Sequence, residues 1–328
     1  MPVMRRRAGR VIVLLAALGF SGPAMAATCT ATVPAFSFPA IDILAGNVVN
    51  AQATMTITCV TTVLDIGSLG TIPVCPGIDA GTGGATAGVR ALKNGTSPLN
   101  YGLYQDSAHT IPWGSNTDAT LGTVPRVNVA VTIPVISGTG GGSATATVYA
   151  QLAGSQTTAP IGHYTSTLGI SARYGTITLP VVGGCGVLLS LLPTTATSSF
   201  VLSADIDKNC LVTTVAINFN SHGVLTANVD AAGQVRVTCT NPTPYTVGLA
   251  VGAFTATTRR MTAGGFFVQY GLYQDSNRTV PWGNVSGQWV SGTGTGLTQN
   301  LPVYGRVPPQ STPPANVYND SVAVTVTY

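Results

Sequence analysis

The sequence predicts an all-β protein made of two tandem β-sandwich domains, and an internal repeat is the main reason. The heptamer Tyr-Gly-Leu-Tyr-Gln-Asp-Ser occurs at 101–107 and again at 270–276, and Pro-Trp-Gly follows each copy. Because a repeat of this length indicates a duplicated unit, we divide the chain into two copies of one domain. Short alternating segments bounded by Gly, Pro, Asn and Asp predict strands, and no stretch has helical periodicity with caps.

The first 26 residues have the features of a secretory signal peptide. Four arginines lie within the first ten residues, an apolar run follows from Val11 to Phe20, and Ala24-Met25-Ala26 forms a small-residue cleavage site. The apolar run is shorter than the roughly 20 residues that span a bilayer. We therefore expect the mature chain to begin at Ala27 and to fold outside the cytoplasm.

The charge balance argues against nucleic acid or an anionic membrane as a partner. The 14 basic residues exceed the 10 acidic ones, which are all Asp, by the four arginines of the signal peptide alone. A neutral mature chain lacks the clustered positive charge that such partners need. Charged residues make up 7% of the chain, against about a quarter in ordinary soluble domains. So few charges give little protection against edge-to-edge strand pairing, which suits a chain that is built into an assembly.

We expect the first domain over 27–175 and the second over 200–328. Both copies close on segments of the same spacing, Tyr164–Tyr174 and Tyr318–Tyr328, and the second alternates valine with polar residues. Similar alternation runs into Cys59 and into Cys239. Each copy, at about 120 to 150 residues, is the size of one sandwich domain.

Six cysteines in an exported chain predict disulfides. The repeat places Cys29 and Cys59 in the first copy where Cys210 and Cys239 lie in the second, so we pair them within each copy. The remaining Cys75 and Cys185 are expected to form a third bridge. A metal site is the poorer interpretation, because no CxxC motif occurs and the three histidines are scattered.

Two insertions distinguish the first copy. One falls near 63–72 and the other within 115–136, and both are apolar for loops. An exposed apolar patch marks an interaction site, but such a segment can also extend a hairpin into the core. We favour an exposed loop for the first insertion and, by a small margin, the hairpin for the second.

The connection between the copies, 176–199, is too apolar to be a flexible linker. An alternating segment with Phe200, Leu202, Ala204 and Ile206 follows it directly. These side chains need a partner that buries them.

Nothing in the sequence indicates an enzyme. His109, His163 and His222 have no nucleophile or carboxylate at a catalytic spacing, and the glycine-rich runs lack the lysine of a phosphate loop. We predict no catalytic residue, no metal and no cofactor.

The repeated YGLYQDS, the trailing PWG, the paired cysteines and the closing Tyr-x9-Tyr segments resemble the spore coat protein U domain family. That family includes subunits of archaic, Csu-type chaperone–usher pili. The resemblance implies immunoglobulin-like, pilin-type sandwiches that lack their last strand and receive it from the next subunit.

Within that family, the chain resembles the two-domain tip adhesins. We expect only Ala27 and Thr28 to precede Cys29, which leaves no donor segment, and the chain stops at Tyr328 without a closing strand for the second copy. The second domain would then receive a strand from the next subunit, with a periplasmic chaperone and an outer-membrane usher as further partners. Part of 176–206 would complete the first copy from within the chain. The candidate donor residues are Ile177, Leu179, Val181, Val187, Leu189, Phe200, Leu202 and Ile206.

The resemblance further implies binding to abiotic or host surfaces through apolar loops of the first domain. The candidate contact residues are Leu64, Ile66, Leu69 and Ile72, then Val131, Ile133, Val135 and Ile136. The alternative is a secreted spore-coat or cell-envelope protein of the same fold; a secreted hydrolase is the third and weakest interpretation.

Overall fold

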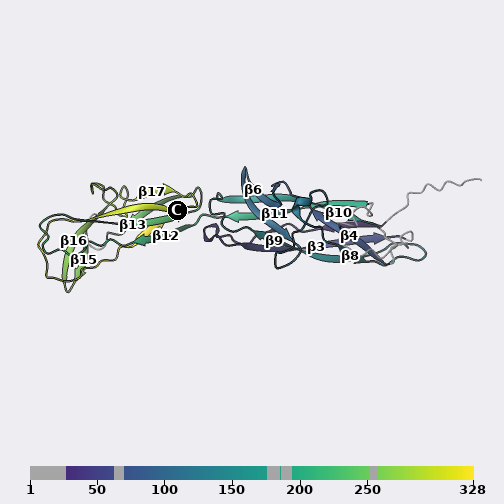
Figure 1. Ribbon diagram of the computed structural model, residues 1–328, viewed down its shortest axis with the longest axis horizontal. Helices are drawn as coiled ribbons and strands as arrows, with labels where there is room; N and C mark the ends of the chain where they lie inside the picture. The colour runs from purple at the N-terminus through teal and green to yellow at the C-terminus, as the bar shows by residue number, and fades with distance from the viewer. Residues whose placement is uncertain (1–26, 63–69, 176–184, 186–193, 252–257) are drawn as a thin grey trace, which may run out of the picture.

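The computed structural model describes residues 27–62, 70–175, 185, 194–251 and 258–328. Figure 1 shows these residues as two β-sandwiches that lie end to end in an elongated molecule. β-Strands form nearly all of the regular structure, which confirms the predicted fold class. The proposed signal peptide, residues 1–26, lies outside the described residues. In the part of the chain that the structure describes, no helix is long and apolar enough to cross a membrane.

The described residues of the first domain form eleven strands and two short 3-10 helices, η1 (Ile43–Ala45) and η3 (Ala119–Leu121). The strands are β1 (Thr28–Thr32), β2 (Phe36–Ser37), β3 (Val49–Thr61), β4 (Thr71–Ile78), β5 (Ala85–Thr86), β6 (Val89–Asn94), β7 (Ser97–Tyr104), β8 (Val127–Ala130), β9 (Gly140–Leu152), β10 (Gly162–Tyr174) and β11 (Thr194–Ile206). The order β1-β3-β9-β7-β6 forms one layer, and β4, β8, β10 and β11 form the other. A single residue pair, Thr165 with Lys93, joins β10 to β6 between the layers.

Period-two alternation explains why these segments pair as one-sided strands. In β3, Met55, Ile57 and Cys59 are buried, while Thr54 and its alternate neighbours are exposed. Side chains on successive residues of a strand point to opposite faces, so this pattern gives one apolar face and one solvated face. The apolar faces of the two layers form a single core. Each fully buried side chain of this kind contributes about 1.5 to 3 kcal/mol.

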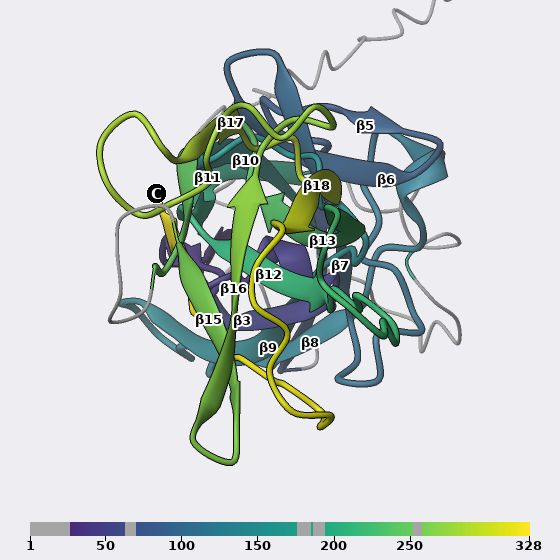
Figure 2. The same cartoon turned by 90° about the vertical axis from the view of Figure 1, so that its left-hand side faces the viewer.

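The second domain repeats this plan with fewer strands. They are β12 (Cys210–Val215), β13 (Val229–Cys239), β14 (Pro244–Leu249), β15 (Arg259–Ala263), β16 (Phe266–Tyr273), β17 (Val290–Thr293), β18 (Gln299–Val307) and β19 (Val324–Thr327). The order β12-β13-β18-β16-β15 forms one sheet and β17-β14-β19 the other. Viewed along the long axis in Figure 2, this domain lies in front of the first.

The boundary between the domains differs from the one expected at residue 200. β11 pairs with β10 along its whole length, from Thr194 opposite Tyr174 to Ile206 opposite Gly162. Phe200, Leu202 and Ile206 are therefore buried in the core of the first domain and not in that of the second. The reason is that an alternating strand follows the sheet it pairs with, wherever the repeat boundary falls in the sequence. The second domain starts at β12, after the three residues 207–209.

The two domains also make direct polar contacts beside this connection. The Ile161 amide donates to the Asn241 carbonyl at 2.6 Å, and the Asn241 side chain donates to the Thr158 carbonyl at 3.0 Å. On the other side, the Asn209 amide group donates to the Asp42 carboxylate at 3.1 Å. These bonds hold the second domain against one end of the first domain, the end that contains the residues after β9.

Candidate functional site: an open groove in the second domain

The disulfides and the strand registers show which strands of the two domains are equivalent. Cys29 pairs with Cys59 across β1 and β3, and Cys210 pairs with Cys239 across β12 and β13, with S–S distances of 2.03 and 2.00 Å. In both copies the disulfide joins residues directly opposite each other on adjacent strands. β1 is therefore equivalent to β12 and β3 to β13.

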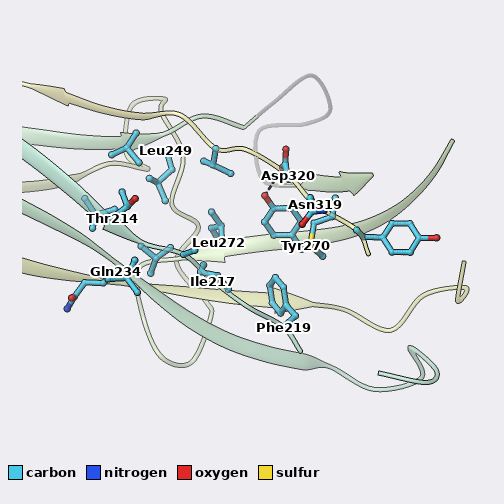
Figure 3. Close-up of a pocket in the computed structure, with 17 residues that line it drawn as sticks. Thr214, Ile217, Phe219, Gln234, Leu249, Tyr270, Leu272, Asn319 and Asp320 are labelled. Atoms are coloured by element: carbon cyan, nitrogen blue, oxygen red, sulfur yellow. Dashed lines mark hydrogen bonds between the residues drawn. The ribbon is translucent and has the colours of Figure 1, made fainter. Parts of the chain in front are cut away.

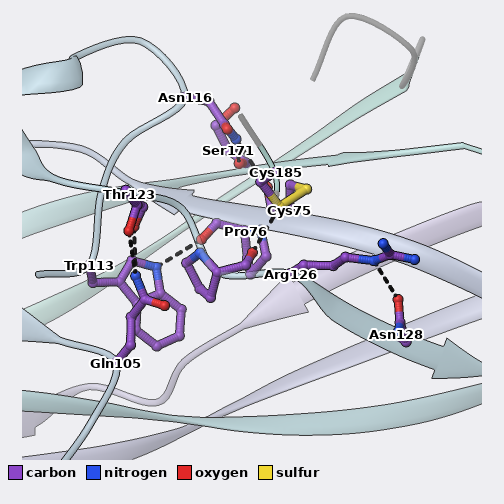
Figure 4. Close-up of a disulfide and its surroundings, with 11 residues drawn as sticks. Cys75, Pro76, Gln105, Trp113, Asn116, Thr123, Arg126, Asn128, Ser171 and Cys185 are labelled. Carbon is purple, nitrogen blue, oxygen red and sulfur yellow. Dashed lines mark hydrogen bonds between the residues drawn. A yellow bond between two sulfur atoms is a disulfide. The ribbon is translucent and has the colours of Figure 1, made fainter. Parts of the chain in front are cut away.

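The third disulfide, between Cys75 of β4 and Cys185, belongs to the first domain alone (Figure 4). Asn116 lies beside it, and its side-chain amide donates to the carbonyls of Cys75 and Ser171. The bridge ties the segment between β10 and β11 to β4. All three pairings are those expected from the sequence.

A buried arginine occupies the same place in each domain, and sequence reasoning missed it. Arg90 donates to the carbonyls of Ile78, Asp79 and Trp113 at 2.7 to 2.9 Å. Arg259 donates to the carbonyls of Leu249, Ala250 and Trp282 at 2.8 to 2.9 Å. Each lies 11 residues before its heptamer, and this matched spacing could have revealed the pair.

Burial lowers the pKa of both guanidinium groups, although they remain charged at any ordinary pH. The tryptophan completes the motif, since Trp113 donates its indole N–H to the Pro76 carbonyl and Trp282 to the Val247 carbonyl. The motif therefore fixes the position of β4 and of β14 against the opposite sheet.

The heptamer forms a core strand and its turn, as expected. Tyr101 and Tyr270 are buried, and burial raises the pKa of both phenols. Asp106 and Asp275 cap the following turns, where each carboxylate accepts hydrogen bonds from two backbone amides. These bonds lower the pKa of both carboxyl groups.

The two domains differ most where the first is completed by β11. That strand pairs with β10 and contacts β1 along its other side. In the second domain β19, the equivalent of β10, pairs with β14, and β12 pairs with β13. Among the described residues, no strand pairs with the remaining edge of either. β19 also spans only Val324–Thr327, whereas β10 has strand geometry from Gly162 to Tyr174.

A cavity of about 290 Å³ lies between these two unpaired edges (Figure 3). Core side chains such as Leu249, Leu272 and Val303 form its floor, and Val324 of β19 and the preceding Val322 line one side. The lining is also polar in part: Thr214, Gln234 and Asn319 contribute to it, and the Tyr270 hydroxyl donates to the Asp320 carboxylate at 2.6 Å. A cavity with an apolar floor between two open edges has the geometry of a site that accepts a β-strand.

The structure describes only some of the predicted donor residues. Phe200, Leu202 and Ile206 are buried in β11, and Phe200 stacks on Phe36 with ring centroids 5.9 Å apart. Ile177, Leu179, Val181, Val187 and Leu189 lie outside the described residues. The strand that completes the first domain is thus the later part of 176–206.

The predicted surface-contact residues are not all exposed. Ile72 is fully buried in β4 and Val131 is nearly so, while Ile133 packs against the same core, so these three do not form a surface patch. The reason is that β8 pairs with β4 and turns the apolar start of the second insertion inward. Val135 and Ile136, by contrast, are 92% and 91% exposed. Leu64, Ile66 and Leu69 lie outside the described residues.

The exposed pair lies at the end of the first domain opposite the groove. Val135 and Ile136 precede β9, and the residues after β9 contact the second domain. Since a strand rises about 3.3 Å per residue, the thirteen residues of β9 separate this loop from the domain contact by about 40 Å. β3 ends at Thr61 opposite Gly140, so its final residue lies at the same end.

This architecture defines a class of protein, a pair of pilin-like sandwiches. In the first, β11 pairs with β10, and in the second, no strand of the described residues fills the groove. A profile of the spore coat protein U (SCPU) domain family matches residues 14–171 and 196–325, which is most of the chain. The chain therefore belongs to the spore coat protein U domain family.

The chain is similar to several individual proteins. The chain is 31% identical to Protein U of Myxococcus xanthus over 153 residues, which cover 41% of this chain and 86% of that protein. A chain of the complex between the CsuC chaperone and the CsuE tip subunit of Acinetobacter baumannii Csu pili has a similar fold. Its TM-score is 0.52 at 17% identity, over 91% of this chain and 100% of that one. The CupB6 tip adhesin of Pseudomonas aeruginosa aligns at 12% identity, over 92% and 93% of the two chains, with a TM-score of 0.39.

Proposed function

We propose that this chain is an exported subunit of a chaperone–usher pilus, that it lies at the tip of the fibre, and that it binds surfaces. The observation that carries the proposal is the contrast between the domains. The first is completed by β11 of its own chain, whereas the second presents a cavity between the unpaired edges of β12 and β19. A fibre subunit would complete the second domain by inserting a strand there.

Three partners follow from this role. A periplasmic chaperone would protect the groove before assembly, because an open apolar edge invites aggregation. An outer-membrane usher would exchange the chaperone for the next subunit. That subunit would supply the strand that remains in the groove. The fold shared with a chain of the CsuC–CsuE complex supports this scheme.

Surface binding is assigned to the opposite end of the molecule. Val135 and Ile136 project from the loop before β9, far from the groove, and a side chain of this size contributes about 1.5 to 3 kcal/mol when it leaves water. Leu64, Ile66 and Leu69 are proposed as additional contacts. Many fibres on one cell would multiply this weak attraction by avidity.

Attachment tests the adhesive part of the proposal. Cells that carry the double variant Val135→Ser, Ile136→Ser should attach less to a hydrophobic surface than cells with the parent chain. Val224→Ser is the matched control, because Val224 is an exposed valine of the second domain. Equal attachment by all three strains, with equal amounts of surface fibre, would contradict a role for this loop.

A donor peptide tests the assembly part. A peptide with apolar residues at alternate positions, added to the unfolded mature chain before refolding, should raise the melting temperature of the second domain and leave the first unchanged. No effect on either domain would favour the alternative, a self-contained spore-coat or envelope protein. The relationship to Protein U of Myxococcus xanthus supports that second candidate.

A further inference from the structure

The groove of the second domain carries a charged residue at one position where the filled site of the first domain has a neutral one. The registers place Ile170 opposite Ile78 in the first domain and Val324 opposite Leu249 in the second. Arg90 and Arg259 bond the carbonyls of Ile78 and Leu249 respectively, so these positions are equivalent. Counting back four residues from Ile170 and from Val324 aligns Ser166 with Asp320. A small hydroxyl residue in one domain therefore corresponds to a carboxylate in the other.

The internal strand shows what happens to this position when the site is filled. Leu202 of β11 lies opposite Ser166, and both side chains are fully buried. Ser166 tolerates burial because its hydroxyl accepts a hydrogen bond from the Gly83 amide at 3.1 Å. Asp320 is exposed at the rim of the groove, and its carboxylate accepts hydrogen bonds from the Tyr270 hydroxyl and from the Ser321 amide. A strand inserted in the register of β11 would cover it.

Covering a carboxylate with an apolar side chain is costly, because the charge loses water and gains no new partner. Tyr270 donates to one carboxylate oxygen and the Ser321 amide to the other, so the remaining acceptor positions of both oxygens face solvent only while the groove is open. An incoming side chain that carries a hydroxyl, amide or amino group would restore the lost hydrogen bond, whereas a leucine would not.

Resting on the proposed function, we infer that Asp320 selects the strand that fills the groove. The selected strand carries a hydrogen-bond donor at the inward position facing Asp320 and an apolar residue at the next inward position, which faces Val322. A strand with the pattern of β11, with Leu202 at the selective position, is disfavoured. The same residue therefore discourages the second domain from capturing β11 of its own chain or of another copy.

The binding of two peptides to the parent chain and to a variant at Asp320 tests this inference. One peptide has the sequence of Thr194–Ile206, and the other is identical except for Leu202→Thr. Each is added to the full mature chain during refolding, and occupancy is measured by competition with a labelled peptide. The parent chain should prefer the threonine peptide by about tenfold, since an unpaired buried charge carries a penalty of that order. The chain variant Asp320→Ser should prefer the leucine peptide.

A second chain variant and a control peptide complete the experiment. Asp320→Asn keeps a hydrogen-bond acceptor but loses the charge. Its preference between the two peptides should therefore lie between those of the parent chain and of Asp320→Ser. This variant replaces Asp320→Ser in the test if the serine variant does not fold. A peptide with Phe200→Asp should not bind any of the chains, because its apolar anchor is gone.

Each outcome decides a separate point. If the parent chain binds both peptides equally, Asp320 does not select the strand, although the groove still accepts one and the proposed function stands. If Asp320→Ser is less stable but keeps the parent's preference, Asp320 serves only as a countercharge for the nearby Arg259, and the inference fails. If no peptide binds any chain, the groove is not a strand acceptor, and the proposed function fails with it.

Discussion

At the scale of single residues, the buried arginines Arg90 and Arg259 each hold several backbone segments of their domain together. Each donates three hydrogen bonds to backbone carbonyls at the end of a strand of the opposite sheet and in the loop that holds the tryptophan, and those carbonyls lose this donor if the arginine is removed. An unsatisfied buried polar group costs about 1 to 3 kcal/mol. One side chain thus stabilises the contact between strands far apart in the sequence.

We predict that Arg259→Met lowers the free energy of unfolding of the second domain by about 3 kcal/mol or more, since several carbonyls lose their donor together. Arg259→Lys should recover only part of the loss, because one ammonium group cannot reproduce the planar fork. Arg236→Met, at an exposed position of the same domain, should change stability by less than about 0.5 kcal/mol. Urea unfolding measures all three; equal effects of Arg259→Met and Arg236→Met would contradict the prediction.

The turn aspartates make stability dependent on acid. The folded state lowers the pKa of Asp106 and Asp275 through hydrogen bonds from backbone amides. Their contribution is therefore present above the unfolded pKa of about 3.9 and is lost as the pH falls through the lower folded pKa. In melting curves against pH, Asp275→Asn should be less stable than the parent near neutrality and should converge with it in acid. Parallel curves would show that the charge of Asp275 has no role.

At the scale of elements, β11 decides which domain is complete. It contributes a row of inward side chains, of which Leu202 is fully buried, and its backbone extends the ladder of β10 over thirteen residues. The second domain has no equivalent strand among the described residues, and its β19 is correspondingly short. The longer strand, β10, is thus the one that has β11 beside it.

We predict that Leu202→Ala destabilises the first domain by about 2 to 5 kcal/mol, as expected for a fully buried leucine, and leaves the second domain unchanged. The adjacent Val201→Ala is the control, because Val201 is 38% exposed on the opposite face of the same strand. Domain-resolved hydrogen exchange separates the two effects. If both domains lost protection equally, β11 would not belong to the first domain alone.

Much of this architecture could be predicted from the sequence, because the duplication is nearly literal around the heptamer. Two of the cysteine pairings followed from matched spacing, and the third joined the two cysteines that remained. The alternation at Phe200 and Leu202 indicated a strand. The burial of Ile72 could not be predicted, since an apolar residue next to an insertion can face either the core or solvent until the partner strand is known. Asp320 also went unnoticed, because its equivalence to the buried Ser166 becomes clear only from the registers of β10 and β19.

At the scale of the whole molecule, the two domains should differ in stability. The first has a third disulfide and the strand β11 beside β10, whereas the second has a cavity between two edges that no strand of the described residues pairs with. Calorimetry of the mature chain should therefore show two transitions, with the second domain unfolding at the lower temperature. Arg259→Met identifies that transition, because it should lower one transition only. A single transition that shifts as a whole would mean that the domains unfold together.

The short connection at 207–209 has a mechanical consequence. β11 runs toward the second domain, antiparallel to β10, and leads into β12 after only these three residues. A pull on the second domain, with the loop at Val135 and Ile136 held fast, is transmitted along the axis of β11. The hydrogen bonds of its ladder are then loaded together in shear instead of being opened one at a time. On the proposed function, β11 would thereby also act as the tether that resists detachment of the molecule from a surface under flow.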